Sequence, residues 1–444
     1  MKKYIISVLL AAVAFVSCEK YETVKDVNND FKVNFEAFWN MVNEQYCYLG
    51  YKNIDWDAVR SEMLPRVEAA KSEQEFFKVL ASALDYLRDG HVAMFSPFQR
   101  YVCNTYTIDE NGNKYPSNYN STVIKENYLT ERFVTMSGKI YGEIERDGHK
   151  FAYIYYSSFE KDWNDTDYKY INELVESSEG IIFDIRNNGG GVGEIGLTLA
   201  GNFFKEKTHI GYFATKNGKG HDDFSELTPL YVEPSKSHNW TDKKTVLLTN
   251  REVYSTANLF TCALKLAKNV TQIGCISGGG GGMPQTHYLP NGWILYFPGN
   301  VLFDLNKQHI EGGIEPDIEV NCTDEEFDAG TDAIIEEATT VEEPSFGDRA
   351  KQGVKALLRA IGIERKEGDV ADTSRDINYI PRDAAEDEAL PVASADASTL
   401  AFVEGQRQAQ PTKLKSVEDP SLADRATDPR LEAYERDARS MRCR

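Results

Sequence analysis

The feature that most constrains this chain is an alternation of apolar strands and helices after residue 150. Short apolar runs predict strands, and helical apolar spacing predicts helices between them. The predicted strands are Phe151–Tyr156, Gly180–Ile185 and Val246–Leu248, and the predicted helices are Tyr168–Val175, Gly193–Phe204 and Thr256–Lys268. Such alternation favours strands joined by helical crossovers, so we predict an α/β sheet, with Ile314–Val320 as its closing strand.

The start of the chain has the pattern of an export signal. Lys2 and Lys3 precede an apolar run that is too short to cross a bilayer as a stable helix, and the run ends at Ser17 and Cys18. A small residue before cysteine resembles a bacterial lipoprotein signal, so we predict removal of residues 1–17 and acylation of Cys18. Acyl chains would attach the protein to the membrane, either on the periplasmic side of the envelope or at the cell surface. The alternative is an ordinary secretory signal with a chance cysteine.

Composition divides the rest of the chain. A polar tether is expected up to residue 30, and helical apolar spacing predicts a small helical N-terminal domain over residues 31–95. Residues 96–137 are rich in Asn, Tyr and turn residues, which predicts an irregular or β connection too short for a full PDZ module. The α/β core is expected over residues 138–345. Residues 346–444 are rich in Ala, Asp and Arg and poor in aromatic residues, so we predict a largely disordered tail.

Charge and cysteine spacing limit the classes of partner. The formal net charge is −21, and phosphate binding needs concentrated Lys and Arg, so nucleic acid is not an expected partner. The cysteines after Cys18 form no C-x-x-C pair. No metal and no other cofactor is therefore expected.

A serine stands at one predicted junction between strand and helix. Ser255 directly precedes the helix predicted from Thr256, so its hydroxyl is expected near free N–H groups and the positive end of the helix dipole. A nucleophile and its oxyanion are favoured there. The same position also suits a serine that only caps the helix.

Four motifs in a fixed order add to this signal. They are Asp89-Gly90-His91, Asp184-Ile185-Arg186-Asn187-Asn188-Gly189-Gly190-Gly191, Thr249-Asn250-Arg251-Glu252-Val253-Tyr254-Ser255-Thr256-Ala257-Asn258 and Gly313-Ile314-Glu315-Pro316-Asp317-Ile318-Glu319-Val320. Over residues 33–322 the ensemble resembles the tail-specific (C-terminal processing) peptidases and their tricorn-core relatives. The resemblance implies a crotonase-like, ClpP-related α/β core with a helical N-terminal domain. It also implies a serine peptidase that acts on peptides or proteins.

The resemblance assigns candidate catalytic residues. Ser255 matches the nucleophile of the family. One branch of the family uses a lysine base at a position that is Gly280 here, so a lysine base is not supported. The tricorn-like branch uses a histidine and a glutamate, which match His91 and Glu311. A neutral imidazole can accept the serine proton near pH 7.

The link between Glu311 and His91 is open at this stage. The tricorn-like relatives keep a serine directly before the histidine, whereas this chain has Gly90. Asp89 or a bridging water is the alternative partner of the imidazole.

Backbone N–H groups are the expected oxyanion donors. Thr256 follows the nucleophile, and Gly189 or Gly190 allows close approach because it has no Cβ. The sequence does not choose between the two glycines.

Two other functions remain open. The first is a catalytically inactive lipoprotein that binds peptides or small ligands on the same fold, which the absent lysine and Gly90 would favour. The second is a purely structural surface lipoprotein. It accounts for the signal but not for the four motifs.

Overall fold

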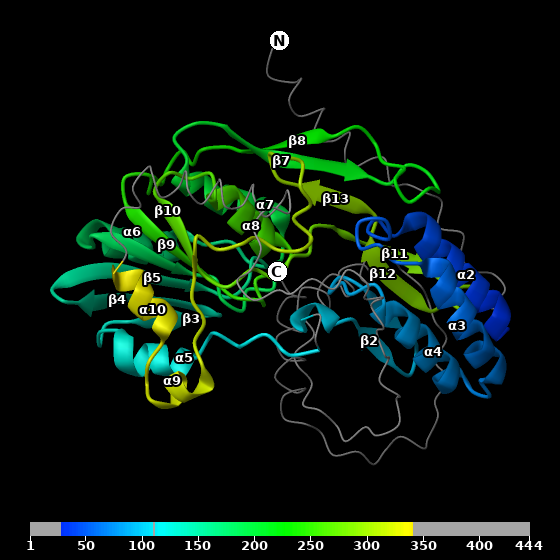
Figure 1. The fold of residues 1–444 in the computed structure, drawn as a ribbon. Helices are drawn as coiled ribbons and strands as arrows, with labels where there is room; N and C mark the ends of the chain where they lie inside the picture. Colours follow the sequence, from blue (N-terminus) through cyan, green and yellow to red (C-terminus); the bar gives the residue numbers. More distant parts are fainter. Residues whose placement is uncertain (1–27, 110–111, 341–444) are drawn as a thin grey trace, which may run out of the picture. The chain divides into compact units, whose positions relative to one another are not determined.

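A computed structural model describes residues 28–109 and 112–340 of the chain (Figure 1). The predicted signal peptide over residues 1–17, the lipidation site Cys18 and the predicted tail over residues 346–444 lie outside the described residues. Within the described ranges, no helix is both long enough and apolar enough to cross a membrane.

The N-terminal part of the described chain packs helices around an aromatic core. The helices are α2 (Phe31–Gln45), α3 (Trp56–Ala69) and α4 (Glu73–Asp85). Each begins after a side-chain cap, because Asp30, Asp55 and Ser72 accept hydrogen bonds from amides of the first turn. Phe38 and Phe76 are fully buried between the helices. This is the helical N-terminal domain that the apolar spacing predicts.

A four-stranded sheet joins this helical domain. Its order is β11 (Pro284–Tyr288), β12 (Ile294–Pro298), β1 (Ala93–Phe95) and β2 (Arg100–Val102). All the pairings are antiparallel, and Ala93 lies opposite Tyr296. Trp293 and Phe297 belong to the same core as α2, α3 and α4. Residues 284–298 therefore pack on the helical domain. The sequence places them in the α/β core instead, because no local pattern in the sequence indicates that two such distant segments pair.

The central sheet has seven strands. Its order is β14 (Ile318–Glu319), β10 (Val270–Gly274), β9 (Lys244–Thr249), β6 (Gly180–Asp184), β5 (His149–Tyr156), β4 (Lys139–Arg146) and β3 (Val134–Met136). The strands from β14 to β5 run parallel, and β4 and β3 extend the sheet antiparallel. The α/β core is confirmed, although the predicted closing strand is reduced to the two residues of β14.

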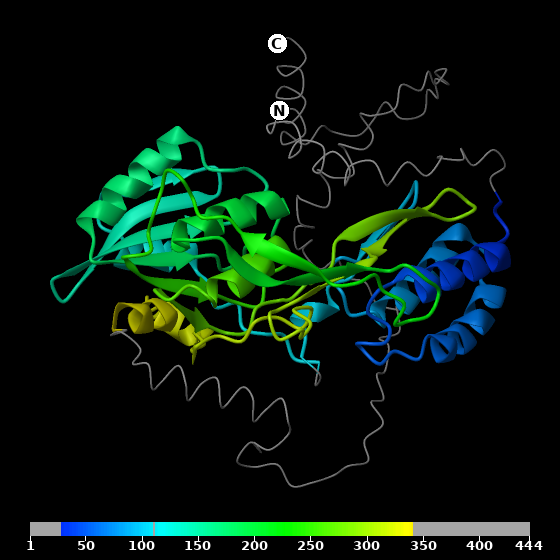
Figure 2. The same cartoon turned by 90° about the horizontal axis from the view of Figure 1, so that it is seen from above.

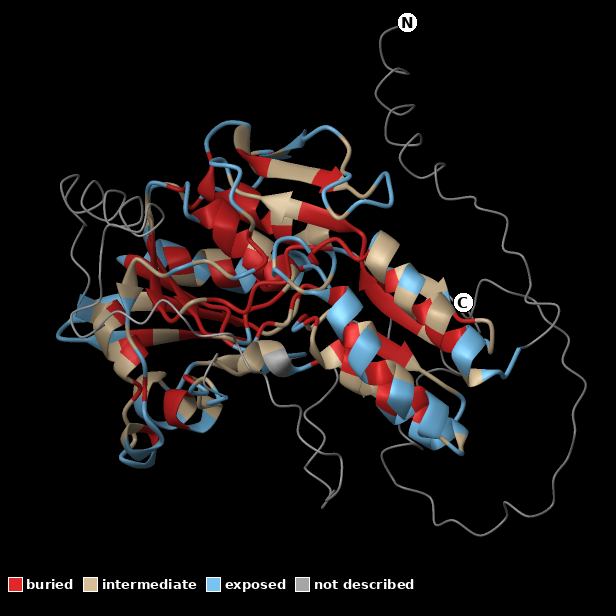
Figure 3. Ribbon diagram, turned by 45° about the vertical axis from the view of Figure 1, so that its right-hand side comes forward, coloured by how far each residue is buried: buried red, intermediate tan, exposed pale blue. Residues whose placement is uncertain are grey.

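Helices cover both faces of this sheet (Figures 1 and 2). On one face Phe183 packs with residues of α6 (Asp165–Ser177), α7 (Gly193–Ala200) and α8 (Thr256–Leu264). On the other face its neighbour Ile182 packs with α10 (Ala333–Thr340). Figure 3 shows the resulting buried strands in red. Strands covered on both faces are continuous apolar runs, which is why the sequence reveals them.

A third sheet and several short turns complete the described chain. The sheet has the order β13 (Asn300–Phe303), β7 (Thr208–Thr215) and β8 (Thr228–Val232) and is antiparallel. These strands are not predicted from the sequence. The short helices are η1 (Thr105–Thr107), α5 (Ser121–Val123), the π-helix η2 (Ile124–Tyr128), η3 (Gly201–Phe203) and α9 (Asp324–Asp328).

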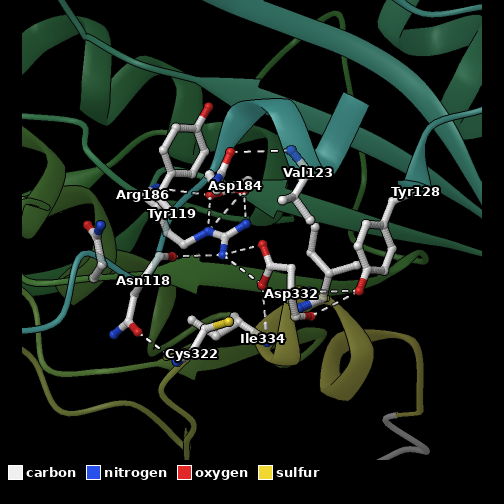
Figure 4. A network of polar contacts seen from close by, with 12 residues as sticks. Asn118, Tyr119, Val123, Tyr128, Asp184, Arg186, Cys322, Asp332 and Ile334 are labelled. Carbon is white, nitrogen blue, oxygen red and sulfur yellow. Dashed lines mark hydrogen bonds and ion pairs between the residues drawn. The ribbon is translucent and has the colours of Figure 1, made fainter. Parts of the chain in front are cut away.

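A buried arginine holds the end of β6 in place (Figure 4). The Arg186 guanidinium contacts Asp184 at 2.6 Å and Asp332 at 2.9 Å, and all three side chains are fully buried. Arg186 also donates to the carbonyl oxygen of Asn118. Asp332 in turn accepts from the amides of Ile334 and Ile335 at the start of α10. The network ties α10 to the strand that leads into the glycine turn.

We expect Asp332→Asn to destabilise the fold. An asparagine can still cap α10 but removes one charged partner of Arg186, which keeps Asp184 as its counter-ion, so the free energy of unfolding should fall by about 1.5–3 kcal/mol in urea denaturation. Glu233→Gln is the matched control, because Glu233 forms an exposed ion pair with Lys207. Its effect should stay below about 1 kcal/mol. Equal effects of the two variants would contradict a stabilising role for the network.

Candidate active site

Ser255 occupies the junction between the loop after β9 and the first residue of α8. Its side chain makes no capping hydrogen bond with the helix. Its Oγ lies 2.9 Å from Nε2 of His91, across a separation of 164 residues. The interpretation of Ser255 as a simple N-cap is therefore wrong.

The backbone of Ser255 is strained. Its φ is +56°, in the left-handed region that non-glycine residues rarely adopt. The amide of Ser255 donates to the Gly279 carbonyl at 2.9 Å, and the amide of Tyr254 donates to the Asn188 carbonyl at 3.0 Å. Strain of this kind costs on the order of 1–3 kcal/mol and persists only where the surroundings impose it. The turn after β6 and the segment after β10 thus fix the direction of the serine side chain.

His91 belongs to the turn that follows α4. Its side chain is 11% exposed, and its ring centroid lies 4.9 Å from that of Tyr254. The backbone amide of His91 donates to Oδ1 of Asp89 at 2.8 Å, and the same oxygen lies 3.9 Å from Nδ1 of the imidazole. The structure thus brings His91, Ser255 and Asp89 together.

Asp89 is fully buried and held by two tyrosines. Tyr254 donates to Oδ1 at 3.0 Å, and Tyr46 donates to Oδ2 at 2.9 Å. Burial alone would raise the pKa of Asp89, but the charge of Lys52, the imidazole and backbone amide of His91 and the Tyr46 hydroxyl lower it. Asp89 is therefore ionised at neutral pH.

The packing around Gly90 explains why this position has no side chain. A Cβ added to Gly90 would lie 2.7 Å from Cε1 of Tyr106 and 3.0 Å from Cζ of Tyr254. The space that a serine would need is filled by these two rings, and the Tyr254 hydroxyl reaches Asp89 instead.

Glu311 contacts a lysine. Its Oε1 lies 2.6 Å from Nζ of Lys52, and its Oε2 accepts from the amide of Gly281 at 2.8 Å. Burial raises the pKa of Glu311 to about 7, although Lys52 opposes the shift. Both carboxylate oxygens of Glu311 are thus engaged, one by the Lys52 ammonium and one by the Gly281 amide.

Lys52 lies between the two carboxylates. Its Nζ is 3.8 Å from Oδ2 of Asp89, and it also donates to the Tyr46 hydroxyl and to the carbonyls of Leu87 and Arg88. Burial opposes the charge of Lys52, but Glu311 and Asp89 raise its pKa overall, so the ammonium stays charged. A cavity of about 620 Å³ borders the pair and is also lined by Tyr254 and Arg251.

The glycine turn after β6 reaches the nucleophile. A Cβ added to Gly190, whose φ is +107°, would lie 2.8 Å from the Cβ of Ser255 and 2.9 Å from the amide nitrogen of Thr256. The Gly190 amide itself donates to Oδ1 of Asn188 at 2.9 Å. Thr256 begins α8, so its amide has no acceptor within the helix.

The lysine positions agree with the absence of a lysine base. A Cβ added to Gly280 would lie 2.6 Å from the ring of Tyr254, which leaves no room for a lysine. Lys307 lies elsewhere, with its Nζ over the ring of Tyr212. In the described part of the chain, no group of three or more His, Cys, Asp and Glu side chains could hold a metal ion.

Comparisons with known proteins agree with this architecture. The model of peptidase family S41 matches residues 150–320, and that of the tricorn protease C1 domain matches residues 27–85. No match was found among the curated proteins. A candidate peptidase from Parabacteroides merdae has a crystal structure with 35% sequence identity and a TM-score of 0.64. The alignment covers 70% of this chain and 96% of that one.

The chain belongs to peptidase family S41. The resemblance drawn from the four motifs is thereby confirmed, and this S41 chain is a serine-type peptidase. The crystal structure of mature CPAF shares the fold at 11% identity and a TM-score of 0.51, over 69% of this chain and 96% of that one. Mature CPAF complexed with lactacystin aligns at 13% identity and a TM-score of 0.50, over 75% and 100% of the two chains.

The residues of the site in this S41 peptidase lie in different parts of the two family matches. The S41 match contains Ser255 and Glu311, the tricorn C1 match contains Lys52, and His91 lies between them. Sequence reasoning missed Lys52 and the hydroxyls of Tyr46 and Tyr254. The one available signal was the position of Tyr254 beside the nucleophile.

We expect Gly190→Ala to move Ser255 away from His91. The added methyl group overlaps the nucleophile's own Cβ at a positive φ, and a displacement of about 1 Å can slow a reaction about 100-fold. The rate of fluorophosphonate labelling should fall accordingly. Gly193→Ala is the control, because its Cβ would meet nothing within 4 Å. Labelling of both variants at the wild-type rate would show that the glycine turn does not position the serine.

Proposed function

We propose that this S41 peptidase hydrolyses peptide bonds through an acyl-enzyme on Ser255, with His91 as the general base. The observation that carries the proposal is the 2.9 Å contact between Ser255 Oγ and His91 Nε2. It lies within the range for proton transfer from a nucleophile to its base. The positive φ of Ser255 supports the proposal, because this backbone conformation points the hydroxyl toward the imidazole. The lack of a capping bond also supports it, because the hydroxyl is not used by the helix.

The first half of the reaction forms the acyl-enzyme. His91 Nε2 takes the proton of Ser255 as Oγ attacks the carbonyl carbon of the peptide, which gives a tetrahedral intermediate with a negative oxygen. The amides of Gly189 and Thr256 are the proposed donors to that oxygen. Gly189 is preferred over Gly190 because the Gly190 amide already donates to Asn188.

The second half releases the acyl group. The imidazolium of His91 gives its proton to the leaving amine, and the peptide C–N bond breaks. A water molecule then attacks the ester of Ser255 while His91 takes a proton from it. Collapse of this second intermediate returns the proton to Oγ and frees the new carboxylate.

We also propose that the peptidase is exported and anchored at the cell envelope. The support is in the sequence: the basic residues Lys2 and Lys3, the short apolar run and the Ser17-Cys18 pair. Labelling of cells with a radioactive fatty acid tests this proposal. Incorporation that is lost in Cys18→Ala is the expected result, and incorporation that persists in that variant would contradict an anchor at Cys18.

Ser255→Ala should abolish both hydrolysis of peptides and labelling by a fluorophosphonate. The protein should remain folded, because Ser255 makes no capping bond whose loss would destabilise α8. Circular dichroism and the melting temperature check the fold of the variant. A folded Ser255→Ala protein with wild-type peptidase activity would rule out this nucleophile. A wild-type protein that neither hydrolyses peptides nor reacts with the label would favour the binding-protein alternative.

His91→Ala should lower kcat by at least about 10⁴-fold, as loss of the base does in other serine peptidases. Wild-type activity should also fall as the pH drops and His91 becomes protonated, because imidazolium cannot accept the serine proton. Lys307→Ala is the control, since Lys307 contacts Tyr212 outside the site. If Lys307→Ala lost activity and His91→Ala kept it, the base would be wrongly assigned.

A further inference from the structure

A chain of buried charges stands behind His91. Nζ of Lys52 is 2.6 Å from Oε1 of Glu311 and 3.8 Å from Oδ2 of Asp89. The side chain of Lys52 is 15% exposed, that of Glu311 4%, and that of Asp89 is fully buried. The ammonium is thus closer to Glu311 than to Asp89.

Uncharged donors fix Asp89 beside the imidazole. The hydroxyls of Tyr46 and Tyr254 and the amide of His91 all donate to its carboxylate, with distances of 2.8–3.0 Å. Each of these donors leaves the negative charge of Asp89 in place. The carboxylate oxygen nearest to Nδ1 of His91 lies 3.9 Å away, close enough for a strong electrostatic effect in a buried site.

We propose that Asp89 is the carboxylate that serves His91, and that Glu311 and Lys52 are positioning residues behind it. Glu311 draws the ammonium of Lys52 onto itself and thereby leaves the charge of Asp89 available to the imidazole. The inference rests on the proposed role of His91 as the base. It differs from a direct relay, in which Glu311 itself would act on His91.

The count of charges supports this division of roles. When Glu311 is ionised, as its 2.6 Å contact with the Lys52 ammonium favours, two carboxylates and one ammonium give the buried group a net charge of −1 while His91 is neutral. Protonation of His91 brings the net charge to zero, so the group stabilises the imidazolium that forms as Ser255 attacks. Without Glu311, Lys52 would cancel Asp89, and the imidazolium would lose this stabilisation.

The other groups that face the cluster keep the same charge in every variant, so they do not change the differences between variants. They are the hydroxyls of Tyr46, Tyr48, Tyr51 and Tyr254 and the thiol of Cys47, and burial raises the pKa of each, so they stay neutral near pH 7. The thiol of Cys103 also lies near Lys52. Arg88 and Arg251 line the same cavity. The Arg251 guanidinium donates to the carbonyls of Tyr106, Ser277 and Gly312.

The test uses Lys52→Met and Glu311→Gln singly and together. Proton NMR can follow the titration of His91 in a Ser255→Ala background, with the resonance assigned by loss in a His91 variant. This measurement needs no peptidase activity, so its outcome is separate from that of the proposed function. The acid limb of kcat/KM against pH, measured with Ser255 intact, gives a second reading of the same groups.

The single variants should shift His91 in opposite directions. Glu311→Gln should lower the pKa of His91 by about one unit, which is a tenfold change in proton affinity. It should also lower kcat about 10- to 100-fold with little change in KM. Lys52→Met should raise the pKa of His91, because Asp89 then has no opposing charge. Shifts in the same direction, or no shift in either variant, would overturn the proposal.

The double variant separates an indirect role of Glu311 from a direct one. It removes a lysine and a carboxylate together, leaves no partner of the pair buried alone and restores the net charge of −1, so it should fold even where a single variant does not. The pKa of His91 and kcat should return toward their wild-type values. If the double variant were as impaired as Glu311→Gln, Glu311 would act on His91 directly.

A second buried pair provides the matched control. Nζ of Lys139 on β4 lies 2.8 Å from Oδ2 of Asp167 on α6, and their side chains are 9% and 1% exposed. Lys139→Met with Asp167→Asn should change the melting temperature and leave the titration of His91 in place. A shift of His91 in this control would mean that the loss of any buried pair disturbs the site, which would also overturn the proposal.

Discussion

Two backbone hydrogen bonds, from Tyr254 to Asn188 and from Ser255 to Gly279, hold the nucleophile in a conformation that a serine does not adopt alone. They join the loop before α8 to the glycine turn on one side and to the segment after β10 on the other. With the backbone held at both points, Oγ is aimed away from the helix amides and toward His91. Those amides are then available to an oxyanion, which an N-capping serine would have blocked. The position of the whole site follows from this local constraint.

The sequence could predict the core because each of its elements carries its own signal. β6 and β9 are covered on both faces and are therefore continuous apolar runs, and α8 follows β9 after a short loop and has helical spacing. The proximity of His91 and Ser255 was also expected, although only through the resemblance of four ordered motifs. No local sequence pattern predicts that two side chains 164 residues apart come within 2.9 Å of each other.

The rest depended on contacts between distant segments. Lys52 follows α2 in a stretch that contains three tyrosines, where a lysine is usually a solvated residue. Its partners come from distant segments of the chain, namely Glu311 and the carbonyls of Leu87 and Arg88. Gly90 suggested a missing catalytic serine, whereas the rings of Tyr106 and Tyr254 fill that space. The β11–β12 hairpin was assigned to the α/β core, since its partner β1 lies about two hundred residues earlier in the chain.

The pairing of β12 with β1 also sets the order in which an active molecule can arise during synthesis. The core around α2, α3 and α4 includes Trp293, Leu295 and Phe297, so the first third of the chain cannot complete its packing until residues near 300 have been made. His91 belongs to that early part, whereas Glu311 emerges later still. A ribosome-bound chain that already contains both Ser255 and His91 therefore still lacks the strands that bring them together. We therefore expect the site to assemble only after most of the sequence has left the ribosome.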